Sequence, residues 1–169
     1  VYKSQAIESS LTGHLVLSTL HTNDAPSTAT RLIEMGVEPF LVGQSLACVV
    51  AQRLVRRLCK NCKRRYDPSE AELKMIGMKP SDITDKDVFY KPVGCEECSN
   101  TGYHGRMAIH EVMLVDGQIE KMIATNATTD EIARVAVSNG MTRLRDDCVL
   151  KARMGLTSLS EIIRVTTAE

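Results

Sequence analysis

The chain has 169 residues, 43% hydrophobic but only 4% aromatic, which is enough for one domain plus a small module around an aliphatic core. Lys and Arg together number 21, as do Asp and Glu, and the resulting net charge of zero argues against a strongly basic nucleic-acid binder. No stretch approaches the ~20 apolar residues of a membrane span, and no signal peptide opens the chain. We therefore expect a soluble cytoplasmic protein that contacts a membrane only through partners.

The first predicted strand lies in "TGHLVLSTLHTN", residues 12–23. Residues 5–12 are typical of a helix end, and the aliphatic run after them predicts a buried strand of a parallel sheet over 14–20. His14 and His21 at its two ends would lie about 23 Å apart on a straight strand, too far to share a metal ion. Open α/β sheets bind ligands beyond the carboxyl ends of their strands, so His21 is the better functional candidate. A plain surface-loop histidine is the alternative.

The following segments predict helices and one more strand. In "NDAPSTATRLIEMG", Asn23 or Asp24 can cap a helix that Gly36 ends. Residues 38–59, "EPFLVGQSLACVVAQRLVRRLC", predict a second helix that runs into a strand near 49–57.

From Cys59 the composition becomes polar and basic. Residues 67–70, "DPSE", predict the start of a short helix that ends at Gly77, and a loop follows as far as Pro92. The glycine-rich "GCEECSNTGYHGR" predicts tight turns. A strand is expected over 107–115, and the remainder is expected to be helical, with helices near 117–124, 128–140, 142–155 and 158–165.

Four of the six cysteines form two pairs, Cys59-x2-Cys62 and Cys95-x2-Cys98. Each C-x2-C turn supplies two thiolates, and two turns supply the tetrahedral set of a structural zinc site. A metal would offset the small core of such a module, since zinc contributes about 10–16 kcal/mol in zinc-finger peptides. Disulfides are disfavoured by the expected compartment. A redox pair is disfavoured because neither pair opens a helix after a strand.

The two remaining cysteines, Cys48 and Cys148, lie in helical or apolar contexts and are expected to be small buried residues rather than ligands. The sequence has no G-x-x-x-x-G-K-[ST] phosphate loop, and no apolar strand ends in acidic residues that would hold magnesium. The isolated chain is therefore expected to lack a phosphate-binding centre and to be inactive alone. In a nucleotide-driven machine it would be the part downstream of that centre.

Four long motifs carry a family resemblance: "TGHLVLSTLHTNDAPSTATRLIEMGVEPFLV", "AQRLVRRLC", "GCEECSNTGYHGRMAIHEVM" and "GMTRLRDDCVLKARMGLTSLSEIIRVT". In this order they resemble the C-terminal part of the ATPase motors of type IV pilus assembly and type II secretion, from about Ala6 to Thr166. The run "APSTATRLIEMGVEPFLV" is more similar to the pilus branch. Two features depart from the family pattern. Residues 1–5 do not match what precedes the histidine box, and Cys148 stands where the family usually has glycine.

The resemblance implies an α/β fold in three segments. Residues 1–57 would be the C-terminal portion of a RecA-like ATPase core with its histidine box, 58–105 a tetracysteine zinc-binding module, and 106–169 a returning strand with a helical C-terminal subdomain. The zinc ligands would be Cys59, Cys62, Cys95 and Cys98.

The resemblance also implies a function for the parent protein. It would be a hexameric motor that uses ATP and Mg²⁺ to power pilus assembly, peripheral at the inner membrane through a platform protein, with no nucleic-acid partner. His21 would lie beside the terminal phosphate of the nucleotide, and His14 would orient the backbone or a neighbouring subunit. Arg53 or Arg56 could contact a neighbouring subunit, although a solvated basic edge is the simpler interpretation of either.

Three alternative functions remain open at this point. The first is the type II secretion motor. The second is a stand-alone zinc-binding interaction module without catalysis, which the missing phosphate loop favours. The third is a zinc-ribbon nucleic-acid binder using "RLVRRLCKNCKRR", which the zero net charge and the single nearby aromatic, Tyr66, disfavour.

Overall fold

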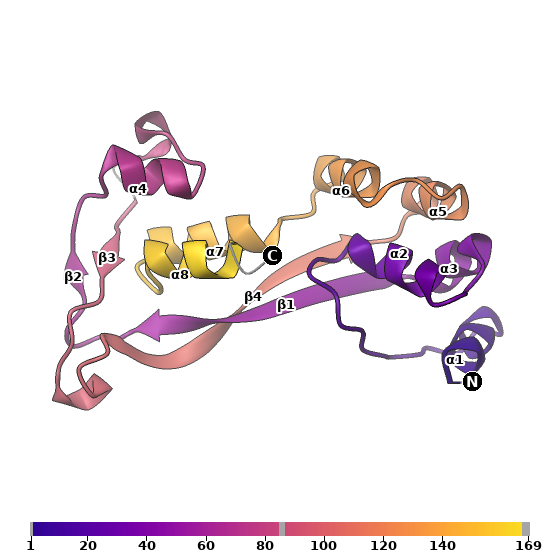
Figure 1. Cartoon of the computed structure of the whole chain (residues 1–169), viewed down its shortest axis with the longest axis horizontal. Helices are drawn as coiled ribbons and strands as arrows, with labels where there is room; N and C mark the ends of the chain where they lie inside the picture. Colours follow the sequence, from indigo (N-terminus) through magenta and orange to yellow (C-terminus); the bar gives the residue numbers. More distant parts are fainter. Residues whose placement is uncertain (1, 85–86, 167–169) are drawn as a thin grey trace. The chain divides into compact units, whose positions relative to one another are not determined.

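The computed structural model describes residues 2–84 and 87–166 of a mixed α/β chain (Figure 1). Its elements follow in the order α1 (Tyr2–Leu11), α2 (Ser27–Glu34), α3 (Pro39–Ser45), β1 (Cys48–Leu58), β2 (Arg64–Arg65), α4 (Glu70–Met75), η1 (Pro80–Asp82), β3 (Tyr90–Lys91), η2 (Glu96–Cys98), β4 (Tyr103–Leu114), α5 (Gly117–Ala124), α6 (Thr129–Ser138), α7 (Leu144–Arg153) and α8 (Leu159–Thr166). Among the described residues, no helix has the length and apolar character that a membrane crossing requires.

The chain divides into two compact units. Unit 1 comprises Val1–Ala51 and Glu111–Arg143, and unit 2 comprises Gln52–His110 and Leu144–Glu169. By sequence, unit 1 holds 5 Lys and Arg against 9 Asp and Glu, and unit 2 holds 16 against 12. The net charge of zero therefore conceals an acidic unit and a basic unit.

Strands β1 and β4 form a two-stranded sheet and contribute residues to both units. At one end Val115 N–H donates to the Ala47 carbonyl at 3.0 Å, and at the other Cys59 N–H donates to the Gly102 carbonyl at 3.0 Å. The start of each strand therefore lies against the end of the other, and the pair is antiparallel.

Unit 1 surrounds an aliphatic core. Its buried members come from α1, α2, α3, α5, α6, the unit 1 ends of the two long strands and the segments that connect these elements: Ile7, Ala25, Ala29, Leu32, Val37, Val42, Val49, Met113, Ile119, Ile123, Ile132, Ala136 and Met141. The helices expected near 117–124 and 128–140 are confirmed, and Gly36 follows α2 as expected, but the N-cap of α2 is Pro26 rather than Asn23 or Asp24. The Asp116 carboxylate caps α5 by accepting from Gln118 and Ile119 N–H, and Thr128 forms a capping box at α6.

Unit 2 contains α4, α7, α8, the short ladder of β2 with β3 and the unit 2 parts of β1 and β4. Strands β2 and β3 are antiparallel, with Arg64 opposite Lys91 and Arg65 opposite Tyr90. Helix α4 begins later than the "DPSE" signal predicts, because Ser69 is its N-cap and forms a capping box with Glu72. As expected, Gly77 follows the helix, with a φ of 67° that favours glycine.

Two expectations are wrong in this structure. Residues 14–20 are extended but belong to neither described ladder, and Leu15 and Leu17 are each 88% exposed. A buried parallel strand needs hydrogen-bonded strands at its edges, and the ladders of the described residues place none beside residues 14–20. Cys48 is exposed rather than buried, because β1 turns alternate side chains to opposite sides and Val49 takes the buried position.

Candidate metal centre and histidine loop

The four paired cysteines converge in unit 2. Cys59 directly follows β1 and Cys62 lies in the next turn, whereas Cys95 directly precedes η2 and Cys98 is its last residue. All four Sγ atoms lie within 4.8 Å of one another. In the sequence, each C-x2-C motif joins only two cysteines that are close along the chain. The fold brings the two motifs together across 36 residues, with Sγ–Sγ distances of 3.8 Å for Cys59–Cys95 and for Cys62–Cys98.

These distances suit a shared tetrahedral metal rather than disulfides. A tetrahedron with metal–sulfur bonds of about 2.3 Å has edges of about 3.8 Å between its sulfurs. The Cys95–Cys98 separation of 3.7 Å fits the same edge. A disulfide would need about 2.05 Å, and all six cysteines are free.

Backbone amides point at the sulfurs. Gly94 N–H donates to Cys62 Sγ at 3.3 Å, and the N–H groups of Cys95 and Gly102 each donate to Cys98 Sγ at 3.2 Å. Burial alone raises the pKa of the Cys98 thiol, but the hydrogen bonds from the Cys95 and Gly102 amides and from the Cys95 and Cys62 thiols lower it to about 6. Thiolates are the metal-binding form of cysteine, so the amides favour the ligand form.

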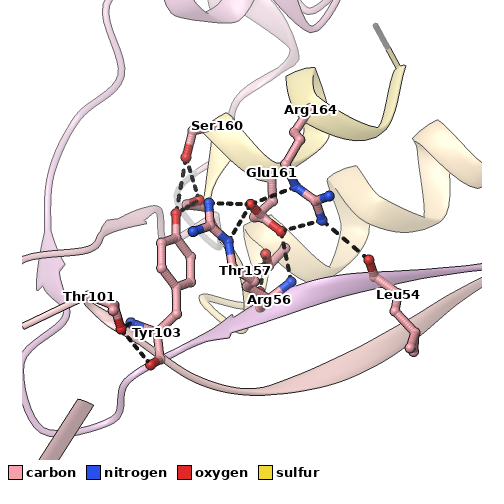
Figure 2. Close-up of polar contacts among 9 residues, drawn as sticks. Leu54, Arg56, Thr101, Tyr103, Thr157, Ser160, Glu161 and Arg164 are labelled. Carbon is pink, nitrogen blue, oxygen red and sulfur yellow. Dashed lines mark hydrogen bonds and ion pairs between the residues drawn. The ribbon is translucent and has the colours of Figure 1, made fainter. Parts of the chain in front are cut away.

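A polar clamp connects β1 to α8 in the same unit (Figure 2). The Glu161 carboxylate is fully buried and lies between Arg56 and Arg164. It accepts from Arg56 N–H at 2.7 Å and from Arg56 Nε at 2.8 Å, and Arg164 Nη2 donates to it at 2.9 Å. Burial raises the pKa of this carboxyl, but hydrogen bonds from Arg164 and Arg56 bring it below its ordinary value of 4.5.

The ring of Tyr103 extends the clamp to β4. The guanidinium of Arg56 lies 4.1 Å from the ring centroid, a cation–π distance. The Tyr103 hydroxyl shares hydrogen bonds with Ser158 at 2.7 Å and Ser160 at 3.1 Å. Figure 2 shows the side chains of Arg56, Tyr103 and Ser160 converging from β1, β4 and α8. Because Tyr103 directly follows Gly102, the clamp fixes the chain that carries the second knuckle.

A second cation–π contact lies beside the first knuckle. Lys63 Nζ is 4.2 Å from the centroid of the Tyr90 ring and donates to the Gly155 carbonyl at 2.7 Å. Burial, followed by the charges of Arg57 and Lys60, lowers the pKa of Lys63. Gly155 has a φ of 66°, and a Cβ there would lie 2.5 Å from the Tyr90 ring.

The two histidines occupy different local structures in unit 1. His14 lies at the end of α1, where its N–H donates to the Ser9 carbonyl at 3.1 Å and Gly13 has a φ of 94°. This is a Schellman-type helix end, and His14 Nδ1 lies 3.2 Å from Thr12 Oγ1. His21 is exposed at the end of the extended segment, directly before the turn that leads into α2.

The turn after His21 is tightly held. Thr22 and Thr28 share a hydrogen bond of 3.0 Å between their hydroxyls, and Asp24 Oδ1 accepts from Ser27 N–H at 2.8 Å. Ala25 N–H donates to the buried carboxylate of Glu111, on β4, at 2.7 Å. A groove of about 320 Å³ lies beside this turn, lined by α1, α2, the end of α3 and the start of β1 together with Val16, Ser18, Thr19, Leu20 and Thr22.

Two buried glutamates were missed by the sequence reasoning, Glu111 and Glu161. The signal for Glu111 is a charge at the position where the alternation of "MAIHEVM" predicts an apolar residue. The signal for Glu161 is its spacing of three residues from Arg164 on a predicted helix. Cys148 is buried, as expected, and burial raises its pKa to about 12, which suits an inert thiol.

Comparison with known proteins decides the family. The model of the family described as "Type II/IV secretion system protein" matches residues 3–164. The chain belongs to this family. It is 46% identical over 161 residues to the type IV pilus assembly ATPase PilB of Thermus thermophilus, covering 95% of this chain and 18% of that protein. It is 43% identical over 161 residues to the type II secretion system ATPase E of Vibrio cholerae, covering 95% and 31%.

Solved structures give the same fold at lower identity. The pilus retraction motor PilT with bound ADP matches with a TM-score of 0.61 and 17% identity, covering 96% of this chain and 35% of that one. The Legionella pneumophila ATPase DotB matches with a TM-score of 0.60 and 18% identity, covering 98% and 35%. The chain spans about a third or less of the length of these relatives, so it corresponds to only a part of such a protein.

Proposed function

We propose that this chain is the C-terminal segment of a hexameric ATP-hydrolysing motor that powers type IV pilus assembly. The observation that carries the proposal is the 46% identity to a pilus assembly ATPase over nearly the whole chain. The parent protein would bind ATP and Mg²⁺ in a part of the sequence outside this segment. It would be cytoplasmic, peripheral at the inner membrane, and would work against a platform protein there.

The expected three-segment organisation is part of the proposal. Residues 1–57 would complete a RecA-like core, 58–105 would be the metal module, and 106–169 would return to the core and end in helices. In the whole motor, the exposed side chains of Leu15 and Leu17 would be covered by neighbouring strands of the core sheet. Amide exchange over residues 14–20 tests this, and we expect it to be slower in the full-length motor than in the isolated segment.

The cysteines would hold one structural zinc ion. The sulfur spacing and the amide donors to Cys62 and Cys98 support this assignment. Metal analysis of the purified chain should return about one equivalent of zinc, as expected for a closed four-cysteine site. A folded chain without metal would refute the assignment.

His21 would hydrogen-bond the terminal phosphate or the attacking water. In the full-length motor, His21→Ala should lose about 10²–10⁴-fold in turnover, the usual contribution of a positioned proton-transfer or hydrogen-bonding group. Its free energy of unfolding should change by less than ~1 kcal/mol, because the side chain is exposed. Nucleotide binding and zinc content should be unchanged. Wild-type turnover in this variant would leave His21 without a role in hydrolysis.

His14 would have a smaller effect on turnover and a larger one on folding or assembly. Its place in the helix end after α1, next to Thr12, supports this difference. His14→Ala, measured beside His21→Ala for turnover, nucleotide affinity and melting temperature, is therefore the matched comparison.

The central experiment compares the full-length motor with the isolated segment. The motor should release phosphate from ATP in the presence of Mg²⁺, and the segment should release none above buffer. Turnover by the segment that persists through repeated purification would reveal an active site within these residues.

Two alternatives have specific support. The type II secretion motor is supported by 43% identity to a secretion ATPase, and complementation of pilus-deficient and secretion-deficient strains separates the two motors.

A zinc-ribbon nucleic-acid binder is supported by the basic excess of unit 2. Binding to nucleic acid that weakens steeply with salt would favour it, and no binding at low salt would exclude it. A stand-alone zinc module would need neither ATP turnover nor nucleic acid.

A further inference from the structure

Glu111 occupies a position on β4 where the strand otherwise buries apolar side chains. Ile109 and Met113, two residues before and after it, are each 0% exposed, and Glu111 itself is 4% exposed. Alternate residues of a strand share a face, so the carboxylate replaces an aliphatic side chain on the buried face. Burial of a carboxylate is unfavourable unless the group is hydrogen-bonded or paired. The buried position of the Glu111 carboxylate therefore requires a hydrogen-bond partner.

Glu111 accepts a hydrogen bond from the backbone of the turn that follows His21. Ala25 N–H donates to Glu111 Oε1 at 2.7 Å across 86 residues of sequence, and Ala25 is fully buried. The same turn is closed by the hydroxyl pair of Thr22 with Thr28. The turn leads into the N-terminus of α2, and the negative charge of the Glu111 carboxylate is favourable there because of the helix dipole. The backbone from residue 22 to 28 is thus fixed from both sides, and His21 stands exposed directly before it.

We propose that Glu111 is a positioning residue for His21. By holding the backbone at Ala25, it gives the imidazole a fixed place from which to act on the nucleotide. The inference rests on the proposed function, because His21 affects a rate only in a motor that hydrolyses ATP. The contact is made to a backbone N–H, so it depends on Glu111 and not on the identity of the side chain at position 25.

The test uses the full-length motor with Glu111→Ala, Glu111→Gln, His21→Ala and the double variant Glu111→Ala/His21→Ala. Glu111→Ala should lower kcat by about 10–100-fold, as small misplacements of reacting groups do, and leave KM nearly unchanged. Glu111→Gln keeps an acceptor oxygen and should retain more turnover. The double variant should be no more than about twofold slower than His21→Ala, because residues that act through one another are not additive.

A second readout does not depend on activity. In Glu111→Ala, the amides of residues 22–28 should exchange faster with solvent, while those of α5 and α6 keep their wild-type rates. Glu34→Ala is the matched control, since that glutamate is 59% exposed on α2, and it should change neither exchange nor turnover. Should Glu111→Ala fail to fold, Glu111→Gln carries both measurements.

Several results would overturn the inference. Wild-type kcat in Glu111→Ala would do so, as would rate losses that multiply in the double variant or unchanged exchange over residues 22–28. A wild-type motor that turns over no ATP would refute the proposed function itself and the inference with it. A motor with normal ATP turnover and an inert Glu111→Ala variant would refute the inference alone.

Discussion

The core of unit 1 is a continuous aliphatic cluster, whereas unit 2 adds to its aliphatic side chains a carboxylate and four clustered cysteines. Unit 1 also buries a carboxylate, Glu111, which accepts a hydrogen bond from the backbone amide of Ala25. Unit 2 holds Glu161 against two guanidinium groups. Aliphatic packing depends little on solution conditions, whereas thiolates and ion pairs depend on metal and proton activity. The two units should therefore lose their folded structure under different solution conditions.

Metal removal should separate the two units most strongly. A strong chelator should open residues 59–98, because the binding free energy of structural zinc in small peptides is about 10–16 kcal/mol. Unit 1 should keep its amide protection, since all four clustered cysteines belong to unit 2. Amide exchange measured segment by segment checks this expectation. Cys62→Ser should reproduce the effect of the chelator, and Cys48→Ser, at an exposed cysteine, is the control. Equal loosening of both units would contradict the comparison.

The second prediction compares two Glu–Arg pairs with the same spacing. Glu161 and Arg164 on α8, and Arg31 and Glu34 on α2, are each three residues apart, but Glu161 is buried and Glu34 is exposed. Glu161→Ala should cost about 3 kcal/mol of the free energy of unfolding, at the low end for a buried pair because its arginines are half exposed. Glu34→Ala should cost less than about 1 kcal/mol. Urea unfolding of both variants measures the difference, and equal costs would show that burial of the clamp adds nothing.

A third prediction concerns pH. The pKa of Glu161 is lower in the folded protein than its ordinary value of 4.5. A carboxyl of this kind contributes stability above its unfolded pKa and loses that contribution as pH falls through its folded pKa. The stability difference between wild type and Glu161→Gln should therefore be constant near neutral pH and shrink on acidification below about pH 4.5. Unfolding free energies measured from pH 7 to pH 3 check this, and a difference independent of pH would contradict the clamp.

The smallest effect should be the same in both units. Ser69 caps α4 in unit 2 and Thr128 caps α6 in unit 1, each by a capping box in which the glutamate three residues later accepts from the cap N–H at 2.9 Å. Ser69→Ala and Thr128→Ala should each cost about 1 kcal/mol. Segment-resolved exchange measures both. A much larger cost at one cap would mean that its unit depends on local helix formation more than the other.

Local signals predicted most of the helices, because caps and stop residues act over a few positions. Helices α5 and α6 lie where the sequence predicts them, near 117–124 and 128–140, and each begins at a capping side chain, Asp116 or Thr128. The C-x2-C pairs likewise identified the sulfurs that cluster, since each pair is a local turn. These features need no knowledge of what lies elsewhere in the chain.

Long-range contacts were not predictable in the same way. The hydrogen bond of Arg56 with Glu161 spans 105 residues, and nothing in either segment names the other as its partner. The strand expected at 14–20 failed for a related reason. Its apolar pattern indicates a side chain's preference for burial, but burial also needs neighbours, and Leu15 and Leu17 have none in the described residues.

The contact between Gly155 and Tyr90 restricts how this sequence can vary. Any side chain at position 155 would collide with the tyrosine ring and would also require a left-handed backbone. Replacing Tyr90 by a smaller residue would remove the clash but would also remove the cation–π contact with Lys63. A lineage could change position 155 only together with position 90, so the two positions are expected to be inherited as a pair. Substitutions in the metal module and in the turn before α8, although these segments are far apart in sequence, would then be correlated.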